Sequence, residues 1–477
     1  MRRVVLTLTL LCVLGVAGAN ANARNARTSP PAGRLETGIV DQAAFSGADS
    51  EAAFAAARAT GATVVRLILN WKAASPAHPT AEFRASDPGD PQYDWDNLDQ
   101  QVREAHAQGL DPIVDIFDAP TWATTGTTVI GRYKPDVAKL AAFAAAAARR
   151  YDGSYDGLPR VRYWQLWDEP NLAWLLRPQY AGSTLQSPAI YRGMLNAFAD
   201  AVHRVHPDNS VIAGGTSPFH TRAGGKSSWG PGPLAFMRDL LCLSKKLTPT
   251  CHNPATFDIW SHHPYTSGGP HHHAVSPDDV SLGDLPEMSA TLAAAVHLHH
   301  VASRQKVRFW VDEFSWDTSP PDPNAVPIAL QTRWVSEALY TMWKAGVSQV
   351  TWFLLKDEPV ATSPYQSGLY FGTGRAKPTL TAFRFPFVAI KHGSTVEVWG
   401  RTPGSKRGSV LIQQKNGASW TTLGRLSASS SGLYGATYPL RGSAPLRATL
   451  VGSTDTSIPY SLVEPPDRSI RPFGEAK

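Results

Sequence analysis

The feature that most restricts the fold of this chain is a regular alternation of short apolar segments with longer helical patterns. The apolar segments occupy positions 36–42, 62–70, 111–117, 161–167, 210–215, 256–263, 307–313 and 348–355. They are rich in β-branched and aromatic residues and nearly continuously apolar, which is typical of parallel strands covered on both faces.

Between these segments, apolar residues recur with helical spacing at 49–60, 95–109, 135–151, 188–206, 233–243, 288–304 and 332–346. Several of these patterns begin with Pro or Asp and end at Gly, as capped helices do. Eight strands with intervening helices predict an α/β fold, a (β/α)8 TIM barrel, over residues 34–384. An open doubly wound sheet is the alternative, but no glycine-rich phosphate loop follows the first strand.

The pattern changes near Phe385. From there the chain alternates with period two, as in TVEVWG, SVLIQQ and LRATLVG, and is interrupted by Gly, Ser and Pro. This alternation predicts a small all-β module, a β-sandwich, over residues 385–465. Residues 466–477 are expected to form a loose tail.

The N-terminus has the composition of a signal peptide. Arg2 and Arg3 precede an apolar stretch at 4–17 and the small residues AGANANA, so we expect cleavage after Ala21 or Ala23 and a signal peptide over 1–23. The stretch is short for an uncleaved membrane anchor, and no later stretch could span a bilayer. We therefore expect a secreted, extracellular protein with no membrane attachment after cleavage.

Two cysteines follow the predicted signal peptide, Cys242 and Cys251 in CLSKKLTPTC. In an oxidising compartment such a pair indicates a disulfide. A metal pair is the alternative, but no further cysteine completes a soft-ligand site. The histidines at 262, 263 and 271–273 lack a metal-ligand spacing, so we expect neither a metal nor a cofactor.

The formal net charge of +6 comes from 45 basic and 39 acidic residues that are dispersed along the chain. No Lys/Arg run stands out, which argues against a nucleic-acid partner. We expect a monomer.

In a TIM barrel, functional side chains lie at the C-terminal ends of the strands. The candidates at these positions are Arg66, Asp118, Trp122, Asp168, Glu169, His263, Tyr265, Glu313 and Trp352. Two glutamates with aromatic neighbours suit the cleavage of sugars, because one carboxyl protonates the leaving oxygen while the other, ionised, attacks the anomeric carbon or activates water. Strand-end aspartates can equally serve as caps or ion-pair members, and Trp122 as a sugar platform or in packing.

Three motifs carry a resemblance to a known group of enzymes. WDEPN at 167–171 resembles the WNEPN signature of clan A glycoside hydrolases, VDEFSW at 311–316 resembles their strand-seven nucleophile motif, and SHHPY at 261–265 their strand-six motif. The resemblance covers residues 36–384. Among the families of the clan, family 39 and family 5-like retaining glycosidases look nearest.

This resemblance implies a retaining mechanism, with Glu169 as acid/base and Glu313 as nucleophile. It also implies that Tyr265 hydrogen-bonds the nucleophile, that Arg66 keeps it ionised, and that Trp352 forms the floor of the subsite for the attacked sugar. The chain departs from the clan at Asp168, where an Asn usually contacts the sugar 2-hydroxyl.

Together these observations predict a secreted retaining β-glycosidase that hydrolyses O-glycosidic bonds of a polysaccharide or oligosaccharide. Arg66, Trp122, Asp168, His263, Tyr265 and Trp352 are the expected substrate-binding residues. A non-catalytic carbohydrate-binding protein on a degenerate barrel is the alternative. The sequence leaves open which sugar is bound and whether action is exo or endo.

Overall fold

The structure is a computed structural model that describes residues 33–125, 132–222 and 229–465. The predicted signal peptide at 1–23 and the predicted tail at 466–477 lie outside the described residues. Among the residues that are described, none of the helices combines the length and apolar character that a membrane span requires.

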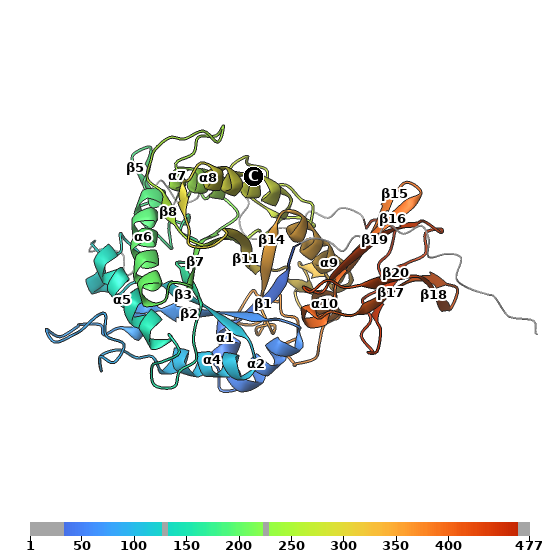
Figure 1. Cartoon of the computed structure of the whole chain (residues 1–477), viewed down its shortest axis with the longest axis horizontal. Coiled ribbons are helices and arrows are strands. Elements are labelled where there is room, and N and C mark those ends of the chain that lie inside the picture. Colours follow the sequence, from blue (N-terminus) through green and yellow to red (C-terminus); the bar gives the residue numbers. More distant parts are fainter. Residues whose placement is uncertain (1–32, 126–131, 223–228, 466–477) are drawn as a thin grey trace, which may run out of the picture.

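The N-terminal part is a closed barrel of eight parallel strands in the order β1-β14-β11-β9-β7-β4-β3-β2, which confirms the predicted fold (Figure 1). The strands are β1 (Glu36–Val40), β2 (Val64–Asn70), β3 (Asp111–Phe117), β4 (Tyr163–Leu166), β7 (Ser210–Thr216), β9 (Ile259–His262), β11 (Arg308–Phe314) and β14 (Val347–Phe353). Because all of them run in the same direction, their C-terminal ends meet at one mouth.

Helices cover the outside of the barrel. They are α1 (Gln42–Phe45), α2 (Ser50–Ala59), α3 (Trp71–Ala74), α4 (Asp96–Ala107), α5 (Val137–Arg150), α6 (Ser187–Val205), α7 (Pro233–Leu240), α8 (Leu285–His297), α9 (Ile328–Lys344) and α10 (Pro378–Arg384). Their caps follow from the sequence; the Asp136 side chain, for example, accepts the N–H of Lys139 at the start of α5.

The helix α8 ends well before its predicted end. The pattern at 288–304 predicts a helix throughout, yet α8 ends at His297. His299 adopts a left-handed conformation (φ 58°), and the N–H groups of His299 and His300 donate to the carbonyls of Val296 and Ala295. This is a Schellman motif, which usually has a glycine at the left-handed position. Because histidine rather than glycine occupies this position, the sequence pattern does not predict that the helix ends here.

The loops contain three two-stranded ladders among the residues that the structure describes. Their strands are β5 (Tyr180–Ala181), β6 (Thr184–Leu185), β8 (Ala255–Thr256), β10 (Val301–Ala302), β12 (Thr318–Ser319) and β13 (Val326–Pro327).

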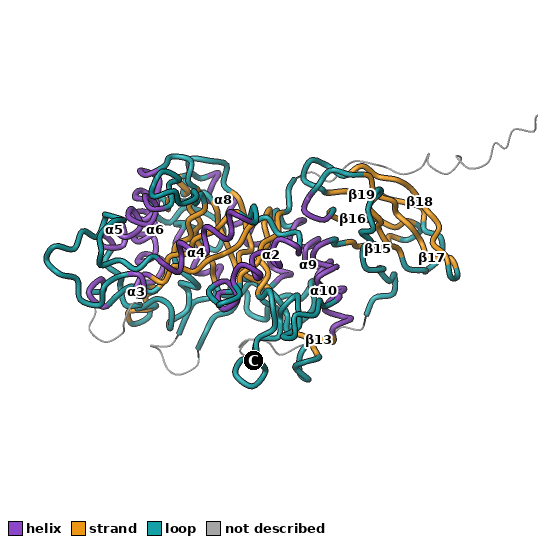
Figure 2. The backbone as a smooth tube through the Cα atoms, turned by 90° about the horizontal axis from the view of Figure 1, so that it is seen from below, coloured by secondary structure: helices purple, strands orange, loops and turns teal. Residues whose placement is uncertain are grey.

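The C-terminal part is all-β, as predicted, and forms two three-stranded antiparallel sheets, β15-β16-β19 and β18-β17-β20. Their strands are β15 (Phe387–His392), β16 (Thr395–Arg401), β17 (Ser409–Asn416), β18 (Ser419–Ser427), β19 (Leu433–Pro439) and β20 (Leu446–Leu450). Figure 2 shows α9 and α10 between the barrel and these sheets. The Trp399 ring lies 5.4 Å from Tyr340 and 5.5 Å from Trp343 of α9, so an aromatic seam joins the two parts.

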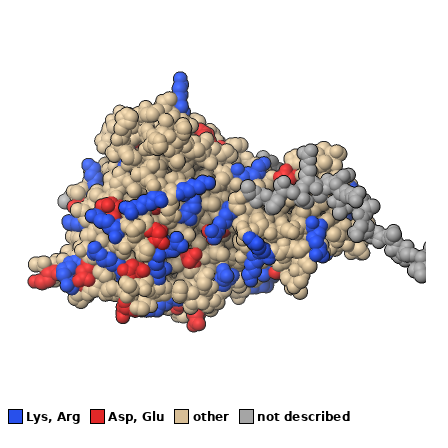
Figure 3. All heavy atoms as spheres, in the orientation of Figure 1, with Lys and Arg blue, Asp and Glu red and all other residues tan. Residues whose placement is uncertain are grey.

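On the face seen in Figure 3, basic and acidic side chains are interspersed. On this face, the charges that are dispersed along the sequence are thus also dispersed in space.

The expected disulfide between Cys242 and Cys251 is present just after α7. The Arg192 guanidinium of α6 donates to the Asn253 carbonyl at 3.3 Å, so the bridged loop is also tied to the helical layer.

Replacing both cysteines by serine should lower the free energy of unfolding by at most about 3 kcal/mol, because the bridge closes a loop with a sequence separation of only 9. Thermal unfolding of the variant and the wild type measures this loss. Labelling of the denatured, unreduced wild type should leave both cysteines unmodified, and modification of the pair would contradict the bridge.

Candidate active site

The barrel mouth is organised around Arg66, which points inward from β2 and is only 1% exposed. Its Nη2 donates to Asp115 Oδ2 at 2.7 Å and to Asp168 Oδ1 at 2.7 Å. Its Nη1 donates to Glu313 Oε2 at 2.9 Å, and its Nε to Gln165 Oε1 at 3.2 Å. One guanidinium therefore holds carboxyl groups from β3, from β11 and from the end of β4.

Burial alone would lower the pKa of Arg66, but the surrounding carboxylates outweigh it. Asp115 and Asp168, followed by Asp312 and Glu313, raise the pKa of Arg66 well above its usual value. Burial also raises the pKa of Asp115 to about 7, with Arg66 opposing this shift. The floor of the site is thus a fixed positive charge under a group of acids.

Glu313, near the end of β11, has both carboxyl oxygens engaged. Oε1 accepts the Tyr265 hydroxyl at 2.9 Å, and Oε2 accepts from Arg66 at 2.9 Å. Burial and the Glu313 charge raise the pKa of Tyr265 well above its usual value, so Tyr265 remains a donor. With two donors, the Glu313 carboxyl is held in one orientation.

Glu169 lies just beyond β4 in a different environment. Its Oε1 faces His263 Nδ1 at 3.1 Å, and its backbone N–H donates to the Gly215 carbonyl at 3.0 Å. Burial raises the pKa of Glu169 to about 7; His263 opposes the shift, while Asp168 and Glu313 add to it. Glu169 therefore keeps its proton up to near-neutral pH.

His263 lies beneath the site and is fully buried. Its Nε2 is 3.5 Å from Asp312 Oδ1, and Asp312 Oδ2 accepts from Gln165 Nε2 at 2.6 Å. Burial would lower the pKa of His263, but Asp312 and Glu313 raise it well above its usual value. Burial would likewise raise the pKa of Asp312, but His263 and Arg66 lower it to about 2. A buried Asp312–His263 ion pair therefore supports Glu169.

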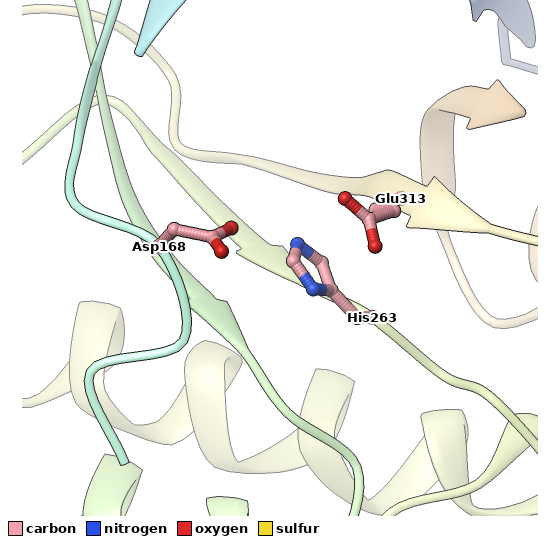
Figure 4. Close-up of side chains that lie close together, drawn as sticks. All are labelled: Asp168, His263 and Glu313. Carbon is pink, nitrogen blue, oxygen red and sulfur yellow. The ribbon is translucent and has the colours of Figure 1, made fainter. Parts of the chain in front are cut away.

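Figure 4 shows Asp168 and Glu313 on opposite sides of the His263 ring, with their carboxyl groups directed inward. Ligand-type atoms of these three side chains lie within 4.8 Å of one another, as a metal site would require. However, Arg66 already bonds both carboxylates, and the charged His263 has no free lone pair to coordinate a metal. The Arg66 guanidinium therefore supplies the positive charge that a metal ion would otherwise supply to these two carboxylates.

Above these groups lies a cavity of about 400 Å³. Its lining consists of Glu169, Leu172, Trp174, Ser217, Pro218, Phe219, Thr221, Tyr265, Glu313, Phe353 and Tyr365. Both glutamates thus reach the same aromatic-lined cavity, which is the chemistry expected of a sugar site.

The structure brings together most of the predicted site residues, with corrections to their roles. Arg66 and His263 were expected to bind substrate, yet both are buried and bond the carboxyl groups instead. Asp168 and Tyr265 do reach the site. Asp168 has a 28% exposed side chain, and Tyr265 lines the cavity.

The expectation that Trp352 forms the floor of the sugar subsite is wrong. Trp352 is 2% exposed, its ring lies 6.0 Å from Phe383 of α10, and its Nε1 donates to the Ser367 carbonyl. Successive strand residues point to opposite faces, so the next residue, Phe353, lines the cavity instead.

Trp122 belongs to the packing between loops. Its ring lies 6.2 Å from Trp71 and 5.7 Å from Phe83, and its Nε1 donates to the Pro76 carbonyl at 2.8 Å. It does not line the cavity, so the substrate-binding role expected for it is not supported.

The site also contains residues that were not predicted, among them Asp115, Trp174 and Tyr365. Asp115 is a lone acid inside the apolar segment DPIVDIF, and a charge there signals a buried partner. Trp174 follows Glu169 by five positions in a loop, where an aromatic residue can serve binding. No comparable sequence feature predicts that Tyr365 lines the cavity.

The sequence and the fold both resemble those of known proteins. A family model described as Cellulase (glycosyl hydrolase family 5) matches residues 21–355. No curated protein matches the chain.

Solved structures share the fold at low identity. A family 39 glycoside hydrolase from Bacteroides cellulosilyticus WH2 has a TM-score of 0.54 at 16% identity, covering 86% of this chain and 81% of that one. A monomeric β-xylosidase from Caulobacter crescentus CB15 has 0.53 at 17%, covering 81% and 84%. The family 39 enzyme from Xanthomonas axonopodis pv. citri has 0.52 at 16%, covering 90% and 97%.

Replacing Arg66 by methionine should lower the free energy of unfolding by about 3–5 kcal/mol near neutral pH, because buried carboxylates then lose their cation. Without the guanidinium, the folded-state pKa values of these acids should rise above their unfolded values. Such acids stabilise the fold below the unfolded pKa, and this stabilisation is lost as the pH rises. The loss should therefore be clearly smaller near pH 4 than near pH 7.

Denaturant unfolding at both pH values measures the two losses. Arg204→Met is the control, since Arg204 is exposed and forms an ion pair with the exposed Asp200, and it should change stability little at either pH. An Arg66→Met loss that is the same at both pH values would contradict the charge account.

Proposed function

The chain belongs to glycosyl hydrolase family 5, the cellulase family, and on that premise we propose that it is a retaining β-glycosidase acting by double displacement. Glu169 is the acid/base and Glu313 the nucleophile. The observation that carries the proposal is the difference between the two carboxyl environments. Glu313 accepts hydrogen bonds from Arg66 and Tyr265, whereas burial raises the pKa of Glu169 to about 7.

In the first step, a Glu313 oxygen attacks the anomeric carbon while the glycosidic C–O bond breaks. Glu169 gives its proton to the leaving oxygen, and a covalent glycosyl-enzyme forms. The charged His263 donates to Glu169 Oε1, so the transferable proton sits on Oε2.

In the second step, water attacks the same carbon and the bond to Glu313 breaks. Glu169, now ionised, accepts the proton of the water and returns to its acid form. Arg66 and Tyr265 receive the released carboxylate with donors already in place, so little reorganisation is needed.

Asp168 is proposed to contact the C2 substituent of the attacked sugar. Its Oδ1 accepts from Arg66, while its side chain is 28% exposed at the mouth. An ionised carboxylate can only accept hydrogen bonds, so Asp168 selects a donor at C2, such as a hydroxyl.

A carbohydrate-binding protein without catalytic activity remains the second candidate, since the aromatic cavity alone would serve binding. A binding function alone would not explain why Glu169, an acid with a raised pKa, shares the cavity with Glu313, which accepts two hydrogen bonds. Export of the protein is also proposed, on the leader sequence and the disulfide; N-terminal sequencing of the secreted protein tests it.

Replacing Glu169 by alanine should slow hydrolysis of alkyl glycosides far more than that of activated aryl glycosides, by about 10²–10⁴-fold, because only poor leaving groups need the proton. Azide should restore turnover on activated substrates by attacking the intermediate without a base. Glu313→Gly should abolish formation of the intermediate. Steady-state kinetics and mass spectrometry after a 2-fluoro glycoside measure both.

Glu358→Gln is the matched control, because Glu358 follows β14 but does not line the cavity, and it should keep near-normal activity. Labelling of a residue other than Glu313 by the fluoro glycoside would remove the nucleophile assignment.

The alkaline limb of kcat/KM should fall near pH 7, because Glu169, whose pKa is raised to about 7, must be protonated to act as the acid. The Asp168 charge adds to that shift, so Asp168→Asn should move the limb to lower pH. A pH–rate profile of each protein measures this. A limb that does not move would exclude the coupling between the adjacent acids.

A further inference from the structure

Trp174 is an exposed aromatic side chain at the active-site cavity. It follows Glu169 by five residues, lines the same cavity as both glutamates, and is 47% exposed. Large aromatics usually bury their rings, as Trp164 and Trp167 do here. A half-exposed indole beside the acid/base therefore offers an apolar face to a ligand.

The backbone that carries Trp174 is fixed on both sides. Arg132 Nη1 donates to the Trp174 carbonyl at 2.8 Å, which ties this loop to the loop after β3. Trp167 Nε1 donates to the Leu175 carbonyl at 2.8 Å, and Leu175 N–H to the Leu172 carbonyl at 3.0 Å. A ring on a braced loop loses little conformational entropy when a ligand stacks on it.

A second hollow lies next to the cavity. It measures about 220 Å³, shares Thr221 with the cavity, and is lined by Tyr180, Arg222 and Trp229 among others. Thr221 and Gly230 exchange backbone hydrogen bonds of 3.0 and 2.9 Å, which holds Trp229 in place. The Arg222 guanidinium lies 5.9 Å from the Trp229 ring, so the hollow combines aromatic faces with hydrogen-bond donors.

Trp174 and the second hollow both lie on the side of the barrel mouth that carries Glu169. Trp174 and Tyr180 follow β4, and Thr221 and Trp229 follow β7, the neighbour of β4 in the barrel. Glu169 protonates the leaving oxygen in the proposed function, so the leaving group extends toward these residues. The attacked sugar lies over Glu313, Asp168 and Tyr265.

We propose, resting on the proposed function, that the cleft has two leaving-group subsites. Trp174 stacks on the first sugar ring beyond the cleaved bond, and the hollow of Tyr180, Arg222 and Trp229 holds the second. The substrate class is then a β-linked oligosaccharide or polysaccharide with at least two sugars on the leaving side. Glycosides of small alcohols leave both subsites empty.

The test compares substrates that differ only in the leaving group: a glycosyl fluoride, the disaccharide and the trisaccharide of the sugar that the wild type prefers. Trp174→Ala should lower kcat/KM about tenfold or more on both oligosaccharides, because the stacked ring loses its apolar face. It should change the rate on the fluoride less than twofold, since fluoride reaches neither subsite. Trp229→Ala should affect only the trisaccharide. Equal losses on all three substrates would overturn the proposal.

Binding to a variant that cannot protonate the leaving group tests the two subsites separately from the proposed function. In the Glu169→Gln background, calorimetric titration with the trisaccharide should show weaker binding when Trp174→Ala is added. Trp420→Ala, in the C-terminal strand β18, is the matched control and should leave the affinity unchanged. A wild type that binds but cleaves none of the substrates would refute only the proposed function, and an unchanged affinity of Trp174→Ala would refute the subsites.

Discussion

One buried guanidinium determines how the acids at this barrel mouth behave. Arg66 donates to Asp115, Asp168 and Glu313 from a position that water scarcely reaches. In such an environment each ion pair is stronger than in water, and each unpaired charge is more costly. The acids therefore do not titrate independently; their protonation depends on which of them Arg66 compensates.

The consequence is a division of roles between two chemically identical side chains. Glu313 accepts hydrogen bonds from Arg66 and Tyr265. Glu169 instead faces His263, and burial raises the pKa of Glu169 to about 7, so it holds a proton near neutral pH. His263 is itself balanced by Asp312. Separating the pKa values of paired carboxyls through their surroundings is the general way in which one site supplies an acid and a nucleophile.

Much of this arrangement follows from the sequence, and the misses have physical reasons. Apolar strand segments and capped helices were readable because period and capping are local properties. The end of α8 was not, because His299 fills a left-handed position that sequence rules assign to glycine. Trp352 was misplaced because a shift of one residue in a strand exchanges the two faces. The burial of Arg66 and His263 under the site depends on contacts between residues on different strands, far apart in the sequence, and no local pattern reveals those contacts.

In the proposed mechanism, Glu313, held by Arg66 and Tyr265, attacks the sugar directly. The most direct measurement is proton NMR of the first sugar released from a β-linked substrate, recorded before mutarotation. Two successive displacements at the anomeric carbon predict that the β anomer forms first. An α anomer as the first product would show a single displacement by water and would contradict the account.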